Sequence, residues 1–558
     1  AAGVVIADKP LTEYTPLQKE TNGERIITQY DMYTVGEDGV GLLKIDLLGL
    51  RNLTIIQEAL RIIRENQDKE IDLSKIPFDD KKTYDLLSSG ETTGIFQLES
   101  PGMRRYIKEL KPTSIFDLQA MVALYRPGPM ANIPEFIRRK HNSKLIKYPD
   151  ARLSEILKES YGVITFQDDV LLTAIKVAGY SWAEADKLRK AIGKKIPSEM
   201  KKQHDNFVQG CVTNGMTKGK AESIWILFEP FAGYGFNKAH AAGYATIAFQ
   251  TAYLKANYPV EFMTALLTAE SRGTTGPAKN EKIAQAVAEC KRIKINVLPP
   301  DINKSNQDFT IEDKKNIRFG LSAIKNIGEA AIRSILGGRK AESFNNLDDF
   351  LRKVDLGPVN KKTIESLIKA GAMDSFGNRA NMLISYPQLL ESLHKKIKQE
   401  QEGQGSLFGD TLDNKTQIKK MSENVDDFST KEKLVFEKEF LGLYLTSHPQ
   451  IDNLLALKSL ITHGLELLAE EKEGTRVKIG GIVETTRRIF TKKNGSEMAF
   501  ITISDEKGLS VECVVFPRIF DQYKRLLIKD SVVIVNGFID TKNDKPTIIA
   551  QQISSISN

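Results

Sequence analysis

An acidic side chain interrupts an apolar stretch near the start of the sequence. Asp46 lies in VGLLKIDLLGLRNLTI, residues 40–55, which otherwise resembles a strand. A carboxylate removed from water costs several kcal/mol of free energy unless it is paired or binds a metal ion. Asp46 is therefore a candidate metal ligand. Two alternatives stay open: the carboxylate faces a solvated groove, or it caps the helix that begins near Arg51.

Basic residues gather in three places that could bind phosphate oxygens. The densest basic stretch is ADKLRKAIGKKIPSEMKKQ, and residues Ala183 to Lys202 around it hold seven cations and three acids. Its lysines recur at i, i+3 and i+7, which places them on one face of a helix. Such a face would suit a polyphosphate or a nucleic-acid backbone, although a solvated helix surface is the usual explanation of such a run. The candidates in this stretch are Arg189, Lys190, Lys194 and Lys195.

The two other basic groups lie beside glycine and proline turns. FAGYGFNKAHAAGYA places three polar donors within four residues, Asn237, Lys238 and His240, after glycines that permit close backbone approach. The glycines are not followed by GK[ST], so the segment is not a Walker loop. LYRPGPM holds Arg126 at a helix end stiffened by proline, and a fixed guanidinium suits bidentate binding of phosphate. Both segments are candidate anion-binding sites.

Two helical hairpins, IKNIGEAAI and VNKKTIESLIKAGA, are typical of a helix-hairpin-helix pair. In that motif a tight turn directs backbone N–H groups at a DNA phosphate. Asn326 stands where glycine is usual, and asparagine tolerates the left-handed conformation. Asn326 and Gly328 are therefore candidate DNA-binding residues. The alternative is an αα-hairpin that only packs.

A polar segment carries two large apolar residues. Leu407 and Phe408 lie in GQGSLFGD, between the polar stretches KKIKQEQEG and GDTLDNKTQ, which cannot bury them. We expect Leu407 and Phe408 to anchor the segment in a pocket on a partner protein. The alternative is a short segment that folds back on its own domain.

The elements that must position these residues change along the chain. Short β-rich runs and one amphipathic helix occupy residues 1–75, and helices with apolar residues at i, i+3, i+4 and i+7 dominate residues 76–300. Residues 475–553 switch to the period-two alternation of five strands, with a hairpin signal at Asn494–Gly495 and a helix after the third strand. This order is that of an OB-fold, a common platform for single-stranded nucleic acid, or of a small structural β-barrel. The predicted fold is multidomain and mixed: a partial α/β domain, a large all-α domain, a helix-hairpin-helix domain and a C-terminal β OB-fold.

The composition is that of an ordinary multidomain protein. At 558 residues, with 41% hydrophobic and 27% charged residues, we expect about three or four domains. Cys211, Cys290 and Cys513 have no paired spacing, which argues against disulfides and a zinc site and suits a reducing cytosol. No apolar run reaches the roughly 18 residues that span a membrane. The opening AAGVVIADKP lacks Met and reads as a buried strand, so we expect the chain to begin inside a domain.

Eight motifs together resemble one family. They occur in the order found in the α subunit of bacterial DNA polymerase III, the C-family replicative polymerase: KIDLLGL, TGIFQLESPGM, ALYRPGPM, GVITFQDDV, ADKLRKAIGKK, FAGYGFNKAHAAGYA, YLKANYPVEFM and GLYLTSHP. The resemblance covers essentially the whole chain, and eight collinear motifs are far more specific than any one of them. It implies a DNA-directed DNA polymerase of chromosomal replication, acting by two-metal nucleotidyl transfer.

The resemblance also implies partners, a location and a division into domains. The partners are primer–template DNA, deoxynucleoside triphosphates, a sliding clamp and other replicase subunits, in the bacterial cytoplasm at the nucleoid and not at a membrane. The domains are the later part of a palm over residues 1–75, fingers over 76–305, a clamp-binding domain with the hairpin pair over 306–440, connecting helices over 441–474 and an OB-fold over 475–558.

The resemblance assigns roles to the candidate residues. In the family the acid of the KIDLLGL motif is one of three carboxylates that hold two Mg²⁺ ions, so Asp46 is expected to be a catalytic metal ligand. Lys44, on the same face, is expected to contact a phosphate. QGSLF, residues 404–408, is similar to the motif that binds the sliding clamp. The grip on the triphosphate is expected from Arg126, Arg189, Lys190, Lys194, Lys195, Asn237, Lys238 and His240.

The chain departs from the family in ways that bear on catalysis. The paired acids of a D-x-D strand, which lie earlier in the family's palm, do not occur here. The N-terminal phosphoesterase-like domain, the first palm segment, the thumb and the domain that follows the OB-fold in longer members are also expected to be missing. We therefore expect a fragment that catalyses nothing alone. The alternative function is a non-catalytic module that binds DNA and the sliding clamp.

Overall fold

The structure, a computed structural model, divides the chain into two compact units. The first unit comprises residues 1–54 and the second residues 55–558, and each has its own architecture. The residues that the structure describes are 3–20, 24–36, 39–47, 49–194, 197–228, 235–273, 276–340, 342–401, 425–446, 451–468, 471–491, 495–505, 509–542 and 545–555.

The first unit contains two small antiparallel sheets, as its β-rich sequence predicts. In one sheet β1 (Gly3–Ile6) pairs with β4 (Leu43–Asp46). In the other β2 (Leu17–Lys19) pairs with β3 (Ile26–Thr28). Asp46 therefore lies at the end of a strand that has one partner strand.

The β1–β4 ribbon has an apolar face that is exposed. Its register places Val4 opposite Ile45 and Ile6 opposite Leu43, and residues directly opposite each other share a face. These four side chains are 41–61% exposed, so the expectation of a buried strand at the start of the chain is wrong. The physical reason is that a two-stranded ribbon buries a face only against a second layer, and the described residues of this unit provide none over this face.

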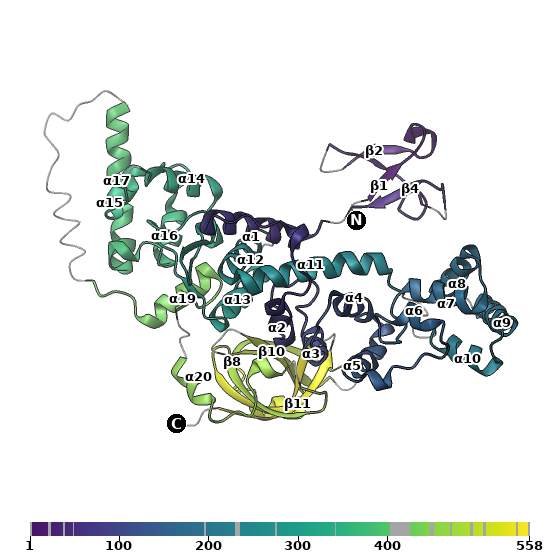
Figure 1. Cartoon of the computed structure of the whole chain (residues 1–558). Coiled ribbons are helices and arrows are strands. Elements are labelled where there is room, and N and C mark those ends of the chain that lie inside the picture. Colours follow the sequence, from purple (N-terminus) through teal and green to yellow (C-terminus); the bar gives the residue numbers. More distant parts are fainter. Residues whose placement is uncertain are drawn as a thin grey trace. The chain divides into compact units, whose positions relative to one another are not determined.

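Helices make up most of the second unit (Figure 1), and the helical prediction for residues 76–300 is confirmed. These helices are α1 (Arg51–Gln67), α2 (Lys81–Ser89), α3 (Pro101–Leu110), α4 (Ile115–Leu124), α5 (Ile133–His141), α6 (Leu153–Leu157), α7 (Gln167–Ala178), α8 (Trp182–Lys194), α9 (Pro197–Thr213), α10 (Lys218–Ile226), α11 (Lys238–Asn257), α12 (Pro259–Gly273) and α13 (Pro277–Arg292).

Local sequence sets the ends of these helices. Asp80, Ser100 and Ser114 accept hydrogen bonds from backbone N–H groups in the first turns of α2, α3 and α4, which satisfies donors that have no partner inside the helix. α2 and α7 end at Gly90 and Gly179, both in the left-handed conformation that glycine adopts without strain.

Two hydrophobic cores hold the helices that carry the candidate phosphate-binding residues. α2, α3, α4 and α5 pack with α11 in one core, and α6 to α10 form another. Ala245, Ala248 and Ala252 of α11 lie in the first core, which also contains residues of α4. Their small side chains recur every three or four residues on one helix face, so the two helices can approach closely.

The region after α13 contains the predicted hairpins, and it shares one hydrophobic core with α1, α12 and α13. Asn326, in the turn before α14, has a φ of +66°. This is the left-handed conformation that the sequence predicts for it. The elements of this region are β5 (Asn296–Leu298), β6 (Thr310–Asp313), β7 (Asn316–Arg318), α14 (Glu329–Gly338), α15 (Leu347–Lys353), α16 (Lys361–Lys369), α17 (Arg379–Gln401) and α19 (Thr430–Leu441).

The last region is a closed barrel of five strands, green to yellow in Figure 1, in the order β10-β12-β11-β8-β9. Along the sequence, a helix lies between the third and the fourth of these strands, β10 and β11. Gly495, with a φ of +67°, lies in the connection from β8 to β9. The predicted OB-fold is confirmed. Its elements are β8 (Arg476–Phe490), β9 (Glu497–Ser504), β10 (Ser510–Val515), α21 (Pro517–Tyr523), β11 (Val532–Lys542) and β12 (Lys545–Ser555). The preceding helix α20 (Ile451–Leu457) packs against β8 and β11.

Cys211, Cys290 and Cys513 are buried free thiols. Within the described part of the chain, no helix combines the length and the apolar character needed to cross a membrane.

Candidate functional site

Asp46 lies at the end of β4 with its side chain 56% exposed. Lys44, two residues earlier, donates a hydrogen bond from Nζ to Asp46 Oδ1 at 2.7 Å, so the two side chains share a face as predicted. The carboxylate is solvated and paired, because β4 is not covered within this unit. An ion pair this exposed contributes about 0–1 kcal/mol to stability, so the fold itself does not depend on Asp46.

Asp46 does not complete a metal site with the other described residues. Among the residues that the structure describes, no three His, Cys, Asp or Glu side chains form a group that could hold a metal ion. Mg²⁺ takes a near-octahedral set of oxygens, usually one or two carboxylates with water and substrate phosphates. Asp46 is therefore a candidate for one ligand of such a site, and the described residues place no group of three such side chains around it.

The N-terminus of α11 holds three of the predicted phosphate-binding residues. Asn237 caps the helix, and its side chain accepts a hydrogen bond from the backbone N–H of His240 at 2.9 Å. Lys238 Nζ pairs with Glu159 at 2.9 Å, and both side chains are about half exposed. The positive end of a 20-residue helix, a lysine and an imidazole are thereby brought within one turn. This arrangement suits the binding of an anion.

Arg126 joins this group although it lies more than a hundred residues earlier in the chain. Its guanidinium lies over the ring of Phe236, 5.4 Å from the ring centre. Phe236 lies 5.3 Å from the imidazole of His240, which in turn lies 4.2 Å from Tyr244. The guanidinium also donates from Nη2 to Gln97 Oε1 at 3.2 Å. The structure thus brings Arg126 to the N-terminus of α11 through its contact with Phe236. Phe236, His240 and Tyr244 form an aromatic row there.

Several residues of this site are not identified by the sequence analysis. Phe236 and Tyr244 carry the aromatic row, and Phe96 stacks on Tyr244 at 5.2 Å with an angle of 14° between the rings. Gln97 follows Phe96 and contacts Arg126. All four lie inside the motifs TGIFQLESPGM and FAGYGFNKAHAAGYA. The spacing of aromatic and amide residues in these motifs does not distinguish a binding site from a hydrophobic core.

The start of α7 ties the start of α11 in place. Gln167 donates its backbone N–H to the carbonyl of Phe236 at 2.9 Å. Asp168 Oδ2 accepts the backbone N–H of Lys238, also at 2.9 Å. Since α8 packs in the same core as α7, the basic helix is connected to this site through α7.

Asp169, next to this tie, is buried and has an unusual pKa. Desolvation raises the pKa of Asp169 from 3.8 to about 6, although the backbone N–H groups of Thr165 and Phe166 and the charge of Lys238 act in the opposite direction. A carboxyl whose pKa is higher in the folded state favours folding when protonated, so stability falls as pH rises from about 4 to about 6.

We expect Asp169→Asn to remove this loss of stability. Thr165 and Phe166 both donate to the same oxygen, Oδ2, which the carbonyl oxygen of asparagine can replace. The melting temperature of the variant should equal that of the wild type near pH 4 and exceed it above pH 6, as measured by thermal unfolding across this range. A variant that is less stable at pH 7.5 would contradict this account.

Two cations of α8 are paired within their own helix. Arg189 Nη2 lies 2.8 Å from Asp186 Oδ1, and Lys190 Nζ lies 3.4 Å from Asp186 Oδ2. Both pairs are partly exposed, so they can exchange this partner at little cost. Lys195 and the side chain of Lys194 lie outside the described residues.

In the helix-hairpin-helix turn, the side chain of Asn326 is engaged within the protein. The Asn326 side chain donates from Nδ2 to Ser366 Oγ of α16 at 3.1 Å, so it joins the two hairpins. Gly328 is exposed and caps α14 with no side chain of its own. The backbone N–H groups at this turn, rather than the Asn326 side chain, are the candidate DNA contacts. Gln404, Leu407 and Phe408 lie outside the described residues.

The barrel carries a small aromatic and cationic surface. Phe490 is 72% exposed and Phe516 is 47% exposed. Arg487 lies over the ring of Phe500 at 4.8 Å. Such side chains could stack on bases.

Sequence profiles of known domains match four parts of the chain. The profile described as bacterial DNA polymerase III alpha NTPase domain matches residues 1–49, and that described as bacterial DNA polymerase III alpha subunit finger domain matches residues 52–215. A helix-hairpin-helix motif matches residues 294–382, and an OB-fold nucleic acid binding domain matches residues 477–556.

Relatives with known names are similar over nearly the whole chain. DNA polymerase III subunit alpha of Thermus aquaticus is 41% identical over 99% of this chain and 44% of its own length. The proteins of the same name from Borreliella burgdorferi and Bacillus subtilis are each 40% identical, over 100% and 98% of this chain and 48% and 47% of their own lengths. The chain thus spans about half the length of these relatives.

Proposed function

The chain belongs to the family of the α subunit of bacterial DNA polymerase III, and from this premise we propose that it takes part in template-directed DNA synthesis. The proposed substrates are primer–template DNA and deoxynucleoside triphosphates. The proposed enzyme is a DNA-directed DNA polymerase of the cytoplasm, acting on the chromosome at the nucleoid. The proposed domains are those expected from the sequence: palm, fingers, clamp-binding domain, connecting helices and OB-fold.

The triphosphate is proposed to bind at the N-terminus of α11. The observation that carries this proposal is the convergence of Arg126 with Asn237, Lys238 and His240, from segments far apart in the chain. A guanidinium, an ammonium and a helix N-terminus together can neutralise much of the charge of a triphosphate. Four cations in and just after α8 are proposed to contact the same polyphosphate: Arg189, Lys190, Lys194 and Lys195.

Asp46 is proposed to be the catalytic carboxylate of this chain, with Lys44 beside it as a phosphate contact. The chemistry that Mg²⁺ supplies in such enzymes is stabilisation of the attacking 3′-oxygen and of the leaving pyrophosphate. Two Mg²⁺ ions need several ligands, and Asp46 is the one carboxylate proposed for them here, so further carboxylates would have to join it. We therefore expect no measurable nucleotide incorporation by these 558 residues alone.

The remaining regions are proposed to bind DNA and partner proteins. The exposed turn at Asn326 and Gly328 presents backbone N–H groups to a DNA phosphate, and the exposed aromatic rings of the barrel suit single-stranded DNA. Gln404, Leu407 and Phe408 are proposed to bind the sliding clamp. Other replicase subunits complete the proposed set of partners.

A second function stays possible for the chain taken by itself: a non-catalytic module that binds DNA and the clamp. The observation that favours it is the match of residues 294–382 to a helix-hairpin-helix motif and of residues 477–556 to an OB-fold nucleic acid binding domain. Nucleotide incorporation by the 558-residue chain would exclude this alternative, and DNA binding without incorporation would support it.

The triphosphate site is tested by Lys238→Ala in the full-length polymerase. The ammonium of Lys238 pairs with Glu159, and both side chains are partly exposed. Loss of this pair should therefore hardly affect the free energy of unfolding. Losing one charge-assisted phosphate contact costs roughly 1.5–3 kcal/mol, which should raise the KM for nucleotide about ten- to a hundred-fold. Steady-state kinetics with varied nucleotide would measure it.

Two neighbouring variants serve as controls for Lys238. Lys158→Ala removes an exposed lysine next to Glu159 and should leave the KM unchanged. Glu159→Ala frees the Lys238 ammonium and should not raise the KM. An unchanged nucleotide KM in Lys238→Ala, together with weaker DNA affinity, would place Lys238 on the duplex instead.

A further inference from the structure

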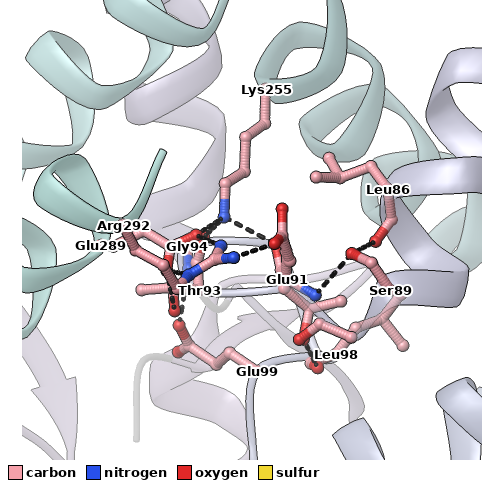
Figure 2. Close-up of polar contacts among 12 residues, drawn as sticks. Leu86, Ser89, Glu91, Thr93, Gly94, Leu98, Glu99, Lys255, Glu289 and Arg292 are labelled. Carbon is pink, nitrogen blue, oxygen red and sulfur yellow. Dashed lines mark hydrogen bonds and ion pairs between the residues drawn. The ribbon is translucent and has the colours of Figure 1, made fainter. Parts of the chain in front are cut away.

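An ion cluster around a buried lysine fixes one end of the segment that contacts Arg126. Lys255, near the end of α11, is buried, and its ammonium donates three hydrogen bonds: to the carbonyls of Glu91 at 2.7 Å and Thr93 at 2.9 Å, and to Glu289 Oε1 at 2.5 Å. Figure 2 shows this side chain pointing into the loop formed by residues 91–98. All three donors of the ammonium are thereby used.

The acid at the centre of the cluster is shared by two cations. Glu289 of α13 also accepts hydrogen bonds from Arg292, from Nε at 2.9 Å and Nη2 at 2.6 Å. The guanidinium of Arg292 pairs in addition with the side chain of Glu91 (Figure 2). Two cations and two acids are therefore matched across the loop and two helices. Lys255 and Glu289 are buried, whereas Arg292 and Glu91 are more than a third exposed. The buried pair keeps its geometry, because removing one member leaves a buried charge unpaired.

From this cluster the 91–98 loop runs beside α11 toward Arg126. The backbone N–H of Phe96 donates to Thr251 Oγ1 at 3.2 Å, and the Phe96 ring stacks on Tyr244. Tyr244, Thr251 and Lys255 are spaced by seven and four residues, which places them on one face of α11. The loop is thus attached to the helix at three levels, over roughly 16 Å of helix length.

The loop holds two residues in the left-handed conformation. Gly94 has a φ of +77°, and a Cβ atom there would come 2.7 Å from the Leu266 side chain. Gln97 has a φ of +58°, although it is not glycine. A non-glycine residue in this conformation costs free energy, and such residues persist where the surrounding structure over-determines them, often at functional sites. At Gln97 the amide oxygen accepts from Arg126.

We propose that Gln97 is a positioning residue of the nucleotide site: it fixes the guanidinium of Arg126, and the Lys255 cluster fixes the loop that carries Gln97. The proposal rests on the role of Arg126 proposed above. Arginine loses much rotamer freedom when it binds a ligand, so an acceptor that holds the side chain beforehand lowers the cost of binding. The cluster acts at a distance, through the three attachments of the loop to α11.

The decisive variant is Gln97→Gly in the full-length polymerase. Glycine removes the amide but adopts the positive φ without strain, so the loop should keep its shape and the melting temperature should not fall. The KM for nucleotide should rise about five- to twenty-fold, between the effects of losing a neutral and a charged hydrogen bond, while kcat changes little. Asp68→Gly, at an exposed residue with a φ of +50°, is the matched control and should change neither constant.

A double variant tests the connection to the Lys255 cluster. Glu289→Gln, like Gln97→Gly, should raise the KM for nucleotide. It should also increase the rate of hydrogen exchange of the backbone amides of residues 91–98. Combined with Gln97→Gly, it should add less than about a twofold further rise, since the two changes act through one contact. Fully multiplied effects in the double variant would overturn the connection.

Arg126→Ala separates this proposal from the proposed function. If Arg126→Ala raises the nucleotide KM and Gln97→Gly does not, the positioning role of Gln97 is overturned while the triphosphate site stands. If Arg126→Ala leaves the KM unchanged, the assignment of Arg126 to the triphosphate fails, and the role of Gln97 fails with it.

Discussion

Replacing Asp46 by asparagine in the full-length polymerase is expected to lower turnover about a thousand-fold, the upper end of the effect of removing one preorganised electrostatic group. Asparagine has the same size and cannot carry the negative charge that a hard cation requires. Primer–template affinity should change less than about twofold, because DNA binding depends mainly on cations at the phosphates. Single-turnover incorporation and a DNA-binding titration would measure the two quantities.

The structure provides reasons to expect that this loss would not come from unfolding. Asp46 is more than half exposed, and Lys44 can donate to the amide oxygen of asparagine as it does to the carboxylate. Asp8→Asn is the matched control: it changes another exposed carboxylate of the same unit, which accepts from Tyr14 Oη at 2.6 Å, and should leave turnover unchanged. Wild-type turnover in Asp46→Asn would remove Asp46 from the catalytic site.

Replacing Leu407 and Phe408 together by alanine is expected to abolish binding of the 558-residue chain to a sliding clamp. Burial of two large apolar side chains is worth about 1.5–3 kcal/mol each, less the cost of ordering the segment. The wild-type affinity should therefore be modest, about micromolar, and the double variant should fall below detection. Titration calorimetry against purified clamp would measure both, without any need for catalysis.

The same variants decide between a docking segment and a folded one. Leu412→Ala, in the same polar stretch but outside the predicted motif, should bind the clamp like the wild type. The melting temperature should stay unchanged in all three proteins if the segment contacts only a partner. Unchanged clamp affinity in the double variant would mean that the contact lies elsewhere, and a large fall in melting temperature would mean that both residues belong to a core.

The elements could be predicted because their signals are local. Alternation with a period of two predicted the five strands of the barrel, and apolar spacing of three and four predicted the helices from residue 76 to 300. Asn326 was predicted to tolerate the left-handed conformation and has a φ of +66°. A backbone conformation of this kind depends on the residue and its nearest neighbours, so the sequence carries it directly.

The burial of the first strand could not be predicted in this way. An apolar strand reads as buried whether or not a second layer covers it, and in the first unit the apolar face of β1 and β4 stays exposed. For the same reason the carboxylate of Asp46, which its apolar neighbours suggested to be desolvated, is paired with Lys44 in solvent. Burial is a property of the assembled layers, not of one segment.

The sequence by itself determined the family, the kinds of element and most of the cations that are candidates for the triphosphate. Only the tertiary structure decided which of them meet: Arg126 reaches the N-terminus of α11, whereas Arg189 and Lys190 pair with Asp186 in their own helix. It alone revealed that Gln97 holds Arg126. The physical reason is that spacing along the chain reports which residues share a helix face, whereas contacts between segments depend on how separate helices and loops pack together.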